Sequence, residues 1–445
     1  MTRIWRLLGI GLAILVLLAG CSMAEEPQAP LRIALDLGIT QRRYAESGDL
    51  EDACSQFIAL ARLNGHLEDF EVEYIPGAGQ ERITALSRLR TEVMAGEGPD
   101  VFICACSDPA AGSPDVLFPF PEKAALNGLF LPLDEYIKQA KFMEWDQLTP
   151  EVMAAGHTDE GQMILPLTYT FHTTIFDQAD LNDDYTGPLT WEQAVASDDP
   201  VWKAACDENW QLYFGEMFGQ LADFQQEKLA FSEDDLLEAV LAAGKLRMEA
   251  AETNREAAIT SETFGAPRHT SVRFGQPNQD HTIRLTYGSG ATTDPAVDLQ
   301  SSEQQARMIP LYNREGGVTA IVTAFAAVSR TTKRPGDAFA VVDSLLSKAG
   351  FRSALYQNLT GVPVHEELGQ ALDRYVNAVP IWYMGRGNFE EYNRIRRQIN
   401  AARFEGPLDE QLWSLSSLLY SDDFEQTRKK VAEAYSDMVM ILAES

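Results

Sequence analysis

The sequence has few cysteines, few basic residues and no long apolar run beyond its N-terminus. Five cysteines in 445 residues are too few for a disulfide framework. Lys and Arg number 36 against 66 Asp and Glu, which gives a net charge of −30. Because no basic patch is visible in so acidic a chain, we expect no nucleic-acid partner. No later segment reaches about 18 consecutive apolar residues, which argues against a transmembrane domain.

The motifs of common enzyme classes are also missing. Residues 287–291, Tyr-Gly-Ser-Gly-Ala, do not have the frame of a Gly-x-Ser-x-Gly nucleophile elbow. Residues 77–79, Gly-Ala-Gly, lack the third glycine of a dinucleotide loop and the lysine of a P-loop. None of the six histidines lies four residues from another, so a zinc-binding His-Glu-x-x-His helix is absent. We therefore predict that the protein is not an enzyme and holds no cofactor or metal.

The four cysteines that follow the N-terminal segment are interpreted as small, buried hydrophobic residues. Cys54 falls on the apolar face of a predicted helix, and Cys206 lies in an acidic, turn-rich segment. Cys104 and Cys106 are two residues apart in an apparent strand, so their Cα atoms lie roughly 6.6 Å apart. That separation is near the upper limit for a disulfide. A zinc site is the other alternative, although no histidine lies at ligand spacing.

Residues 1–22, MTRIWRLLGIGLAILVLLAGCS, have the composition of an export signal. A short basic head precedes the apolar run 7–19, and Leu-Ala-Gly-Cys follows at 18–21. This pattern resembles the lipobox of bacterial lipoproteins, in which the cysteine is acylated and the chain is cut before it. The resemblance implies a signal peptide at 1–20, lipidation of Cys21, a flexible tether at 21–30 and a position on the extracellular or periplasmic face of the cell membrane. An ordinary signal peptide or a short anchor is the alternative.

Apolar spacing beyond the tether predicts an α/β fold. Strands at 31–37, 70–74 and 101–106 alternate with helices at 50–63 and 83–94, and Gly96 closes the second helix. Such alternation favours a parallel sheet whose ligands bind at the carboxyl ends of the strands. Further along we predict extended segments at 163–176, 283–287 and 321–328, helices at 232–258, 335–346 and 422–442, and a polar loop at 259–282.

Several segments, taken in order, resemble extracellular solute-binding proteins of the ABC-importer type, in the sugar-binding group known as family 1. The strongest is LSRLRTEVMAGEGPDVF at 86–102, with its helix, small-residue turn and Pro-Asp before a buried strand. The others are LFLPLDEY at 129–136, GQMILPLTYTFHTTIFD at 161–177, Thr-Trp-Glu at 190–192, the return strand and helix of 316–347, and Gly-Val-Pro at 361–363.

This resemblance implies two α/β lobes with a ligand cleft between them, which is the type II periplasmic-binding-protein fold. The first lobe takes residues 31–167 and, after a return strand, the rest of 318–372. The second takes 168–317 and the C-terminal helices of 373–445. Strands cross between the lobes near 166–170 and 318–323.

The resemblance also implies a function. The protein would capture a small polar solute, an oligosaccharide, and deliver it to ABC permease subunits. We expect a monomer that contacts the membrane only through its lipid anchor. The alternatives are a surface lipoprotein of the same fold that presents a ligand to a sensor kinase or degrades polysaccharide, and a carrier of peptides, polyamines or another polar metabolite.

A sugar site needs flat aromatic rings for stacking and carboxylates or amides that bind hydroxyl groups. Candidates were chosen for their nearness to strand ends and crossings, and several have structural alternatives. Asp36 and Asp108 also fit loop or turn carboxylates, Tyr169 and Phe171 also fit core packing at the hinge, and Trp382 and Tyr383 also fit core filling. The ligand-binding candidates are Asp36, Ser107, Asp108, Tyr169, Phe171, Trp210, Tyr287, Trp382, Tyr383 and Arg386.

Overall fold

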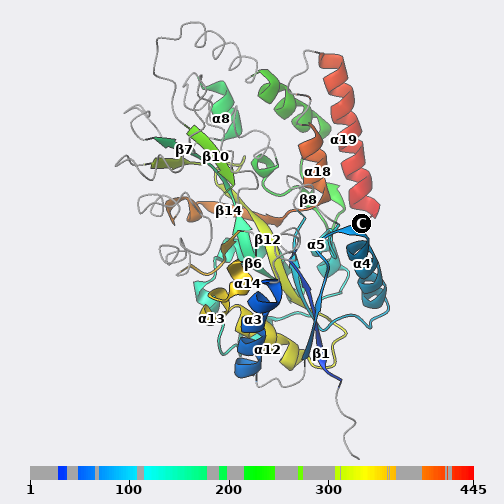
Figure 1. Ribbon diagram of the computed structural model, residues 1–445. Helices are drawn as coiled ribbons and strands as arrows, with labels where there is room; N and C mark the ends of the chain where they lie inside the picture. The colour runs from blue at the N-terminus through cyan, green and yellow to red at the C-terminus, as the bar shows by residue number, and fades with distance from the viewer. Residues whose placement is uncertain are drawn as a thin grey trace, which may run out of the picture.

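The computed structural model (Figure 1) gives the arrangement of most of the chain. It describes residues 29–37, 49–65, 70–107, 115–177, 190–197, 215–245, 269–273, 306–310, 312–357, 359, 361–366, 393–415, 418 and 423–444. Among the helices in these ranges, none has both the length and the apolar composition needed to cross a membrane.

The N-terminal part alternates strands and helices as predicted. In order it contains β1 (Leu31–Asp36), α3 (Asp49–Gly65), β2 (Phe70–Tyr74), α4 (Gly79–Met94) and β3 (Val101–Ala105). Strand β1 lies between β2 and β3 and pairs in parallel with both. The predicted parallel β-α-β-α-β unit is therefore confirmed, and the carboxyl ends of its strands lie at one edge.

Local sequence signals set several helix ends. Gly96 follows α4 with a φ of +75°, a left-handed conformation that glycine adopts without strain. Thr190 caps α8 (Trp191–Ala196) through a reciprocal capping box with Gln193. Pro335 occupies the first turn of α12 (Pro335–Leu345), where its missing N–H costs no helical hydrogen bond. The helix end at Gly96 and the helix start at Pro335 agree with the prediction from the sequence.

A long central strand organises the main sheet. This strand is β12 (Val318–Val328), which is buried along its whole length and pairs antiparallel with β3 and with β6 (Ile164–Thr170). Its first residues, from Val318 to Val322, pair in parallel with β14 (Ile399–Phe404). The sheet order is β13-β6-β12-β3-β1-β2, with β14 attached to β12 and β13 spanning Val362–Pro363. The two predicted crossing segments are thus neighbouring strands.

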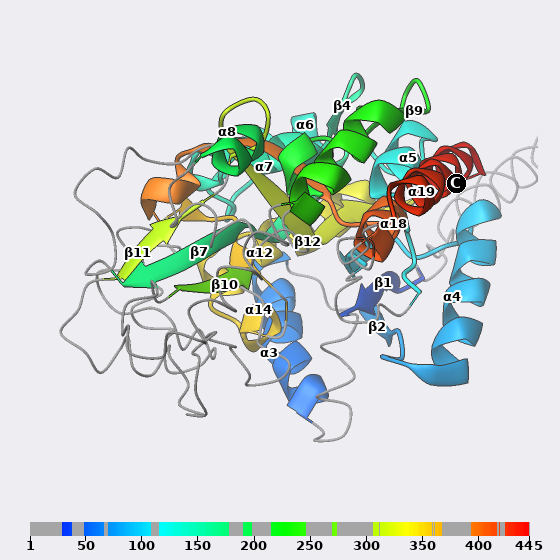
Figure 2. The ribbon, with the colours of Figure 1, turned by 90° about the horizontal axis from the view of Figure 1, so that it is seen from above.

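The predicted extended segment 163–176 consists of two strands rather than one. It divides at Phe171 into β6 and β7 (His172–Asp177), because β6 pairs in the main sheet while β7 joins a separate three-stranded sheet. The partners of β7 are β10 (His269–Arg273) and β11 (Ala306–Ile309), both antiparallel (Figure 2). The loop prediction for 259–282 is therefore wrong at 269–273, since pairing with β7 supplies backbone hydrogen bonds that the local sequence does not reveal.

The remaining elements are mostly short helices around these sheets. Residues 233–245 are helical, within the predicted helix 232–258, and the C-terminal helix α19 (Phe424–Glu444) is close to its predicted bounds. The other helices are α5 (Pro121–Leu126), α6 (Asp134–Ile137), α7 (Pro150–Met153), α13 (Lys348–Phe351), α14 (Ala354–Gln357) and α18 (Pro407–Ser414), with single turns at Trp145–Gln147, Ala154–Gly156 and Glu216–Phe218. Two short hairpins pair His157–Thr158 with Gly161–Gln162 and Ala222–Asp223 with Lys228–Leu229.

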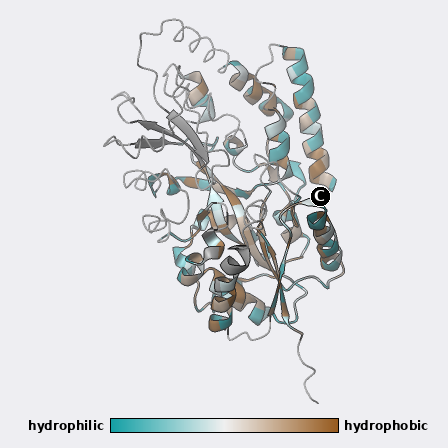
Figure 3. Cartoon of the chain, in the orientation of Figure 1, coloured by the Kyte–Doolittle hydropathy of each residue, from teal (hydrophilic) through white to brown (hydrophobic). Residues whose placement is uncertain are grey.

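Buried apolar residues form two separate cores. The first surrounds the main sheet and includes α3 and α12. The second joins Trp191 of α8, Leu236 of the helix at 233–245, Leu412 of α18 and Val431 of α19. In Figure 3 hydrophobic colouring follows the central strands, while α19 carries both hydrophilic and hydrophobic residues. Strands β6, β12 and β14 belong to the first core, and the chain passes from β14 directly into α18 of the second.

Candidate functional site

Beside the carboxyl end of β3, the main sheet has an irregular strand register and a buried contact between two hydroxyl groups. The register between β12 and β6 shifts on both sides of Ala324, and the Thr168 and Thr323 hydroxyls meet there, buried, at 3.0 Å. The backbone N–H of Cys106 donates to the carbonyl of Thr323 at 2.8 Å. Gly361 has a φ of +102°, and a Cβ there would lie 2.6 Å from Thr323 Oγ1. These close contacts hold β6 and β12 in a fixed position next to the carboxyl end of β3.

Ser107, which follows β3, faces an element of the second core. Its Oγ lies 3.4 Å from Oε1 of Glu410, in the first turn of α18. Ser107 is buried and Glu410 is exposed. A hydroxyl beside the first core and a carboxylate of a second-core helix are therefore adjacent, and groups of both kinds can form hydrogen bonds with hydroxyl groups.

A buried ion pair fixes the turn from β14 into α18. The guanidinium of Arg403 donates to both carboxylate oxygens of Asp409, at 2.8 and 2.7 Å. One of these oxygens also accepts from the backbone N–H of Gly406 at 3.0 Å. Burial on its own would lower the pKa of Arg403, but Asp409, Glu216 and Glu405 outweigh it, so this pKa is raised. Because the charged form is favoured, the turn is held by a permanent cation.

Glu122 lies in the first turn of α5, and its surroundings raise the pKa of its carboxyl group. Burial raises the pKa of Glu122 to about 7, with a smaller contribution from Asp409 in the same direction. Hydrogen bonding with the backbone amides of Glu122 and Phe404, and the charge of Arg403, lower this pKa and do not offset the burial. Glu122 therefore exchanges its proton near neutral pH.

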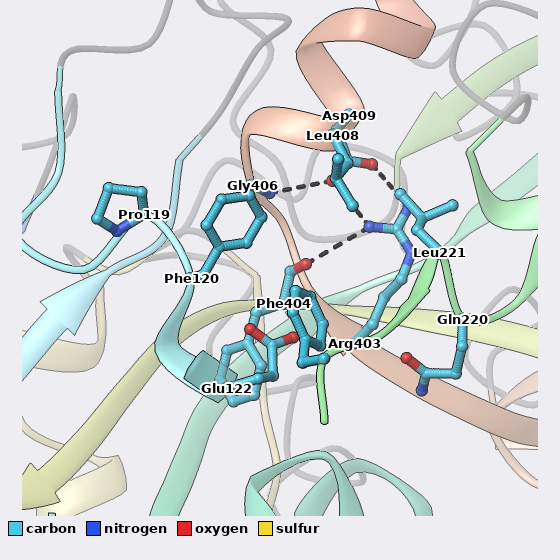
Figure 4. Close-up of a pocket in the computed structure, with 11 residues that line it drawn as sticks. Pro119, Phe120, Glu122, Gln220, Leu221, Arg403, Phe404, Gly406, Leu408 and Asp409 are labelled. Carbon is cyan, nitrogen blue, oxygen red and sulfur yellow. Dashed lines mark hydrogen bonds and ion pairs between the residues drawn. The ribbon is translucent and has the colours of Figure 1, made fainter. Parts of the chain in front are cut away.

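A small pocket lies among these elements (Figure 4). Its walls are largely aromatic and aliphatic, with the rings of Phe120 and Phe224 5.7 Å apart. The polar groups at its wall are Glu122, Gln220, Arg403 and Asp409. The lining is completed by Pro119, Leu221, Phe404, Gly406 and Leu408, so that the pocket joins residues of both cores.

The two cysteines at the end of β3 are buried free thiols, as the interpretation from the sequence expected. Burial raises the pKa of Cys104 and of Cys106 well above the usual range, and Glu122 and Glu405 add to the shift at Cys106. Both remain protonated, whereas a nucleophile or metal ligand needs the thiolate. Within the described ranges, no cluster of three or more His, Cys, Asp or Glu could hold a metal ion.

Asp36, one of the predicted ligand-binding residues, lies in a buried ion pair. Its side chain is fully buried, and both oxygens accept from the Arg82 guanidinium at 2.9 Å. Arg82 also donates to the backbone carbonyl of Asp115 at 2.8 Å. The expectation of a solvated loop carboxylate, which was the alternative reading of Asp36, does not fit this position.

Tyr169 and Phe171 share one side of the chain at the end of β6, as their spacing predicts. Their ring centroids are 6.5 Å apart, and both side chains are fully buried. This packing agrees with the structural alternative, core packing at the hinge, for both Tyr169 and Phe171. Among the candidates in the described ranges, Ser107 is the one whose side chain contacts a helix of the second core. The candidates Asp108, Trp210, Tyr287, Trp382, Tyr383 and Arg386, and the lipidation site Cys21, lie outside the described residues.

The sequence did not predict a role for Glu122, Arg403, Asp409 or Glu410. A signal for one of them was present, because Gly406-Pro407 followed by Asp409 is a typical helix start. The other three have no distinctive local pattern. They come together only when α5 and the β14–α18 turn meet in three dimensions.

Comparisons with known proteins confirm the fold. No family model matches the chain, and no curated protein matches its sequence. An extracellular solute-binding protein of family 1 from Alicyclobacillus acidocaldarius aligns with 94% of this chain and 99% of its own, at 16% identity and a TM-score of 0.55. A periplasmic oligogalacturonide-binding protein from Yersinia enterocolitica covers 93% and 99%, at 15% identity and a TM-score of 0.53.

A de novo designed cysteine esterase is also similar, at 15% identity and a TM-score of 0.58, over 94% of this chain and 99% of its own. Identities this low establish the fold alone. The chain has the two-lobe α/β fold of periplasmic solute-binding proteins, as the resemblance in the sequence implied.

Proposed function

We propose that this protein is a solute-binding protein of family 1 that captures an oligosaccharide between its two lobes and delivers it to an ABC importer. The observation that carries the proposal is the meeting of Ser107, at the end of a first-core strand, with Glu410 of a second-core helix. Ligands of open α/β sheets bind outside the carboxyl ends of the strands, which is where this pair lies.

The chemistry of the pair supports a solute with many hydroxyl groups. The Glu410 carboxylate accepts hydrogen bonds, and the Ser107 hydroxyl both donates and accepts. The unplaced candidates Trp382 and Tyr383 would supply the rings on which a sugar stacks. The similarity to an oligogalacturonide-binding protein supports the same class of ligand.

The proposed location is the outer face of the cell membrane, with Cys21 as the lipidated mature N-terminus. Removing residues 1–20 deletes two arginines from a chain of net charge −30, so the mature chain carries −32. The support for this location is the export signal together with the fold, which occurs in extracellular and periplasmic proteins.

A thermal-shift screen of the mature chain tests the proposal. The panel contains neutral oligosaccharides, oligogalacturonides, short peptides and polyamines, because a ligand that binds only the folded state raises the melting temperature by mass action. We expect stabilisation by a sugar and a smaller radius of gyration in X-ray scattering at saturation. Stabilisation by peptides or polyamines alone would contradict the sugar assignment, and no stabilisation by any class would contradict solute binding.

Two variants locate the site once a sugar is found. Glu410→Gln and Ser107→Ala should each weaken its binding severalfold, because the first removes the charge and one acceptor oxygen of the carboxylate and the second removes the hydroxyl group. Ser87→Ala, at an exposed position on α4, is the matched control and should bind normally. Normal binding by both site variants would move the site away from this strand end.

A further inference from the structure

The segment that leads into α5 passes from the first core into the second and back. Phe118 packs among aromatic rings of the first core. Phe120, two residues later, is buried in the second core with its ring 5.7 Å from that of Phe224. Ala124 then returns to the first core. Residues 118–124 are therefore a place where the two cores hold the same short stretch of chain.

Lys123, in this segment, extends a buried side chain toward two elements of the second core. Its ammonium group forms an ion pair with the carboxylate of Glu227 at 3.1 Å and donates to the backbone carbonyl of Leu442. Leu442 lies in the last turn of α19, next to α5 in Figures 1 and 2. Carbonyl groups at this end of a helix have no partner within the helix and attract a cation. Lys123 thus caps a helix of the other core.

The turn of the hairpin at 222–229 supplies a partner for each of these two side chains, Phe224 for Phe120 and Glu227 for Lys123. In the described ranges Glu227 is the one residue other than glycine with a positive φ, at +52°. This left-handed conformation is uncommon for a residue with a side chain, whereas glycine adopts it without strain. The strain is thus retained at the residue whose carboxylate reaches Lys123, as strain often is at functional contacts. We call the contact of Phe120 and Lys123 with Phe224, Glu227 and Leu442 the clasp.

The clasp and the proposed solute site connect the same two parts of the molecule. On one side, Ser107 follows β3, and the ring of Phe118 packs edge-on against Phe102 of β3 at 5.1 Å. On the other side, Leu442 belongs to α19, which packs beside α18, the helix that carries Glu410. Because Ser107 and Glu410 lie 3.4 Å apart in the same structure, the clasp is made in the arrangement in which the two parts meet at the carboxyl end of β3.

We propose that the clasp favours the closed arrangement of the two lobes and that Lys123 is its positioning residue. This inference rests on the function proposed above and adds to it the element that sets the balance between open and closed lobes. A contact made only in the closed arrangement raises the population of that arrangement. The apparent affinity for a solute that binds between the lobes rises with that population.

Small-angle X-ray scattering of the full mature chain, without any solute, tests the clasp. Lys123→Met removes the ammonium group and keeps an unbranched side chain, and Glu227→Gly removes the carboxylate while glycine still fits the left-handed turn. Each variant should have a larger radius of gyration than the wild-type chain. Lys429→Met alters an exposed lysine of α19 that pairs with Glu433 at 3.7 Å, and this matched control should scatter like wild type.

Solute binding gives the second measurement. Calorimetry with the sugar from the thermal-shift screen should show affinity reduced about tenfold in Lys123→Met, because a hydrogen-bonded charge is lost from the closed arrangement alone. At saturation the variant should reach the wild-type radius of gyration. A merely structural role for Lys123 would lower the urea midpoint and leave the radius and the affinity of the folded chain unchanged.

A wild-type radius of gyration in both clasp variants would overturn the proposal, and so would a smaller radius, which would mean that the clasp keeps the lobes apart. If circular dichroism shows that Lys123→Met does not fold, Glu227→Gly, at an exposed position, decides the question. Because the scattering needs no solute, it is independent of the thermal-shift screen. A chain that no sugar stabilises and whose clasp variants still expand would refute the proposed function and leave the clasp standing.

Discussion

Arg82 donates two hydrogen bonds of 2.9 Å to the carboxylate of Asp36, and both side chains are almost completely buried. The pair links α4 to the carboxyl end of β1. A buried ion pair of this kind is costly to break, because the remaining partner becomes an unpaired charge out of contact with water.

Arg82→Met should therefore lower the free energy of unfolding by about 3–5 kcal/mol. Urea denaturation followed by circular dichroism measures this loss. Arg88→Met is the matched control, since Arg88 is an exposed arginine on the same helix that pairs with Glu73 and Glu92. Exposed pairs contribute about 1 kcal/mol or less, so the control should lose little stability. Equal losses would mean that the buried pair contributes no more than a surface one.

Glu122→Gln should change the pH dependence of stability. The folded-state pKa of Glu122 is raised to about 7, so its neutral form favours folding, and that contribution is complete below about 4.5 and lost as pH rises through 7. At pH 8 the variant should be more stable than wild type by about 1–3 kcal/mol, and at pH 4 the two should be nearly equal. Urea midpoints at both pH values decide this, and a constant difference would contradict it.

Trp382→Ala combined with Asp108→Ala should weaken solute binding at least tenfold while the fold survives. An aromatic contact is worth about 0.5–1.5 kcal/mol beyond its buried area, and hydrogen bonds to a charged group contribute about 1.5–3 kcal/mol. Calorimetry with the sugar from the thermal-shift screen measures the loss. Wild-type affinity in a folded double variant would point instead to Trp210 and Tyr287.

Cys21→Ala should release the protein from the membrane into the soluble fraction. The reason is that the predicted lipid anchor is attached to this thiol, and stable anchoring depends on more than one acyl chain. Cell fractionation with an immunoblot checks the outcome. Cys206→Ala, which alters another cysteine, should stay with the membrane, and a Cys21→Ala variant that also stays there would exclude lipid anchoring at Cys21.

Much of the fold could be predicted because its signals are local. The strand at 70–74 matches its predicted bounds, and Thr190 and Pro335 mark helix starts through capping chemistry and a fixed φ. Strand β10 was missed, since the sequence at 269–273 is polar and the strand forms by pairing with β7. Long-range pairing is the part of a fold that periodicity in one segment does not report.

The site was less predictable than the fold for a related reason. Ser107 could be placed at a strand end from the pattern alone, but the sequence did not reveal that its neighbour is Glu410. Asp36 also sits at a strand end, and its burial with Arg82 depends on how α4 lies against β1. A carboxylate at a strand end can bind a ligand or complete a core, and only the tertiary contacts distinguish the two.

The central position of β12 has a consequence for how the chain reaches its native state. Strand β3 at 101–105 pairs with β1 on one side and needs β12, at 318–328, on the other. Until that late segment arrives, β3 is an apolar edge strand that can pair with other chains. Such distant pairing also slows folding. The first core is therefore completed only after residues 318–328 have been synthesised, and a chaperone that shields β3 until then would protect the chain from aggregation.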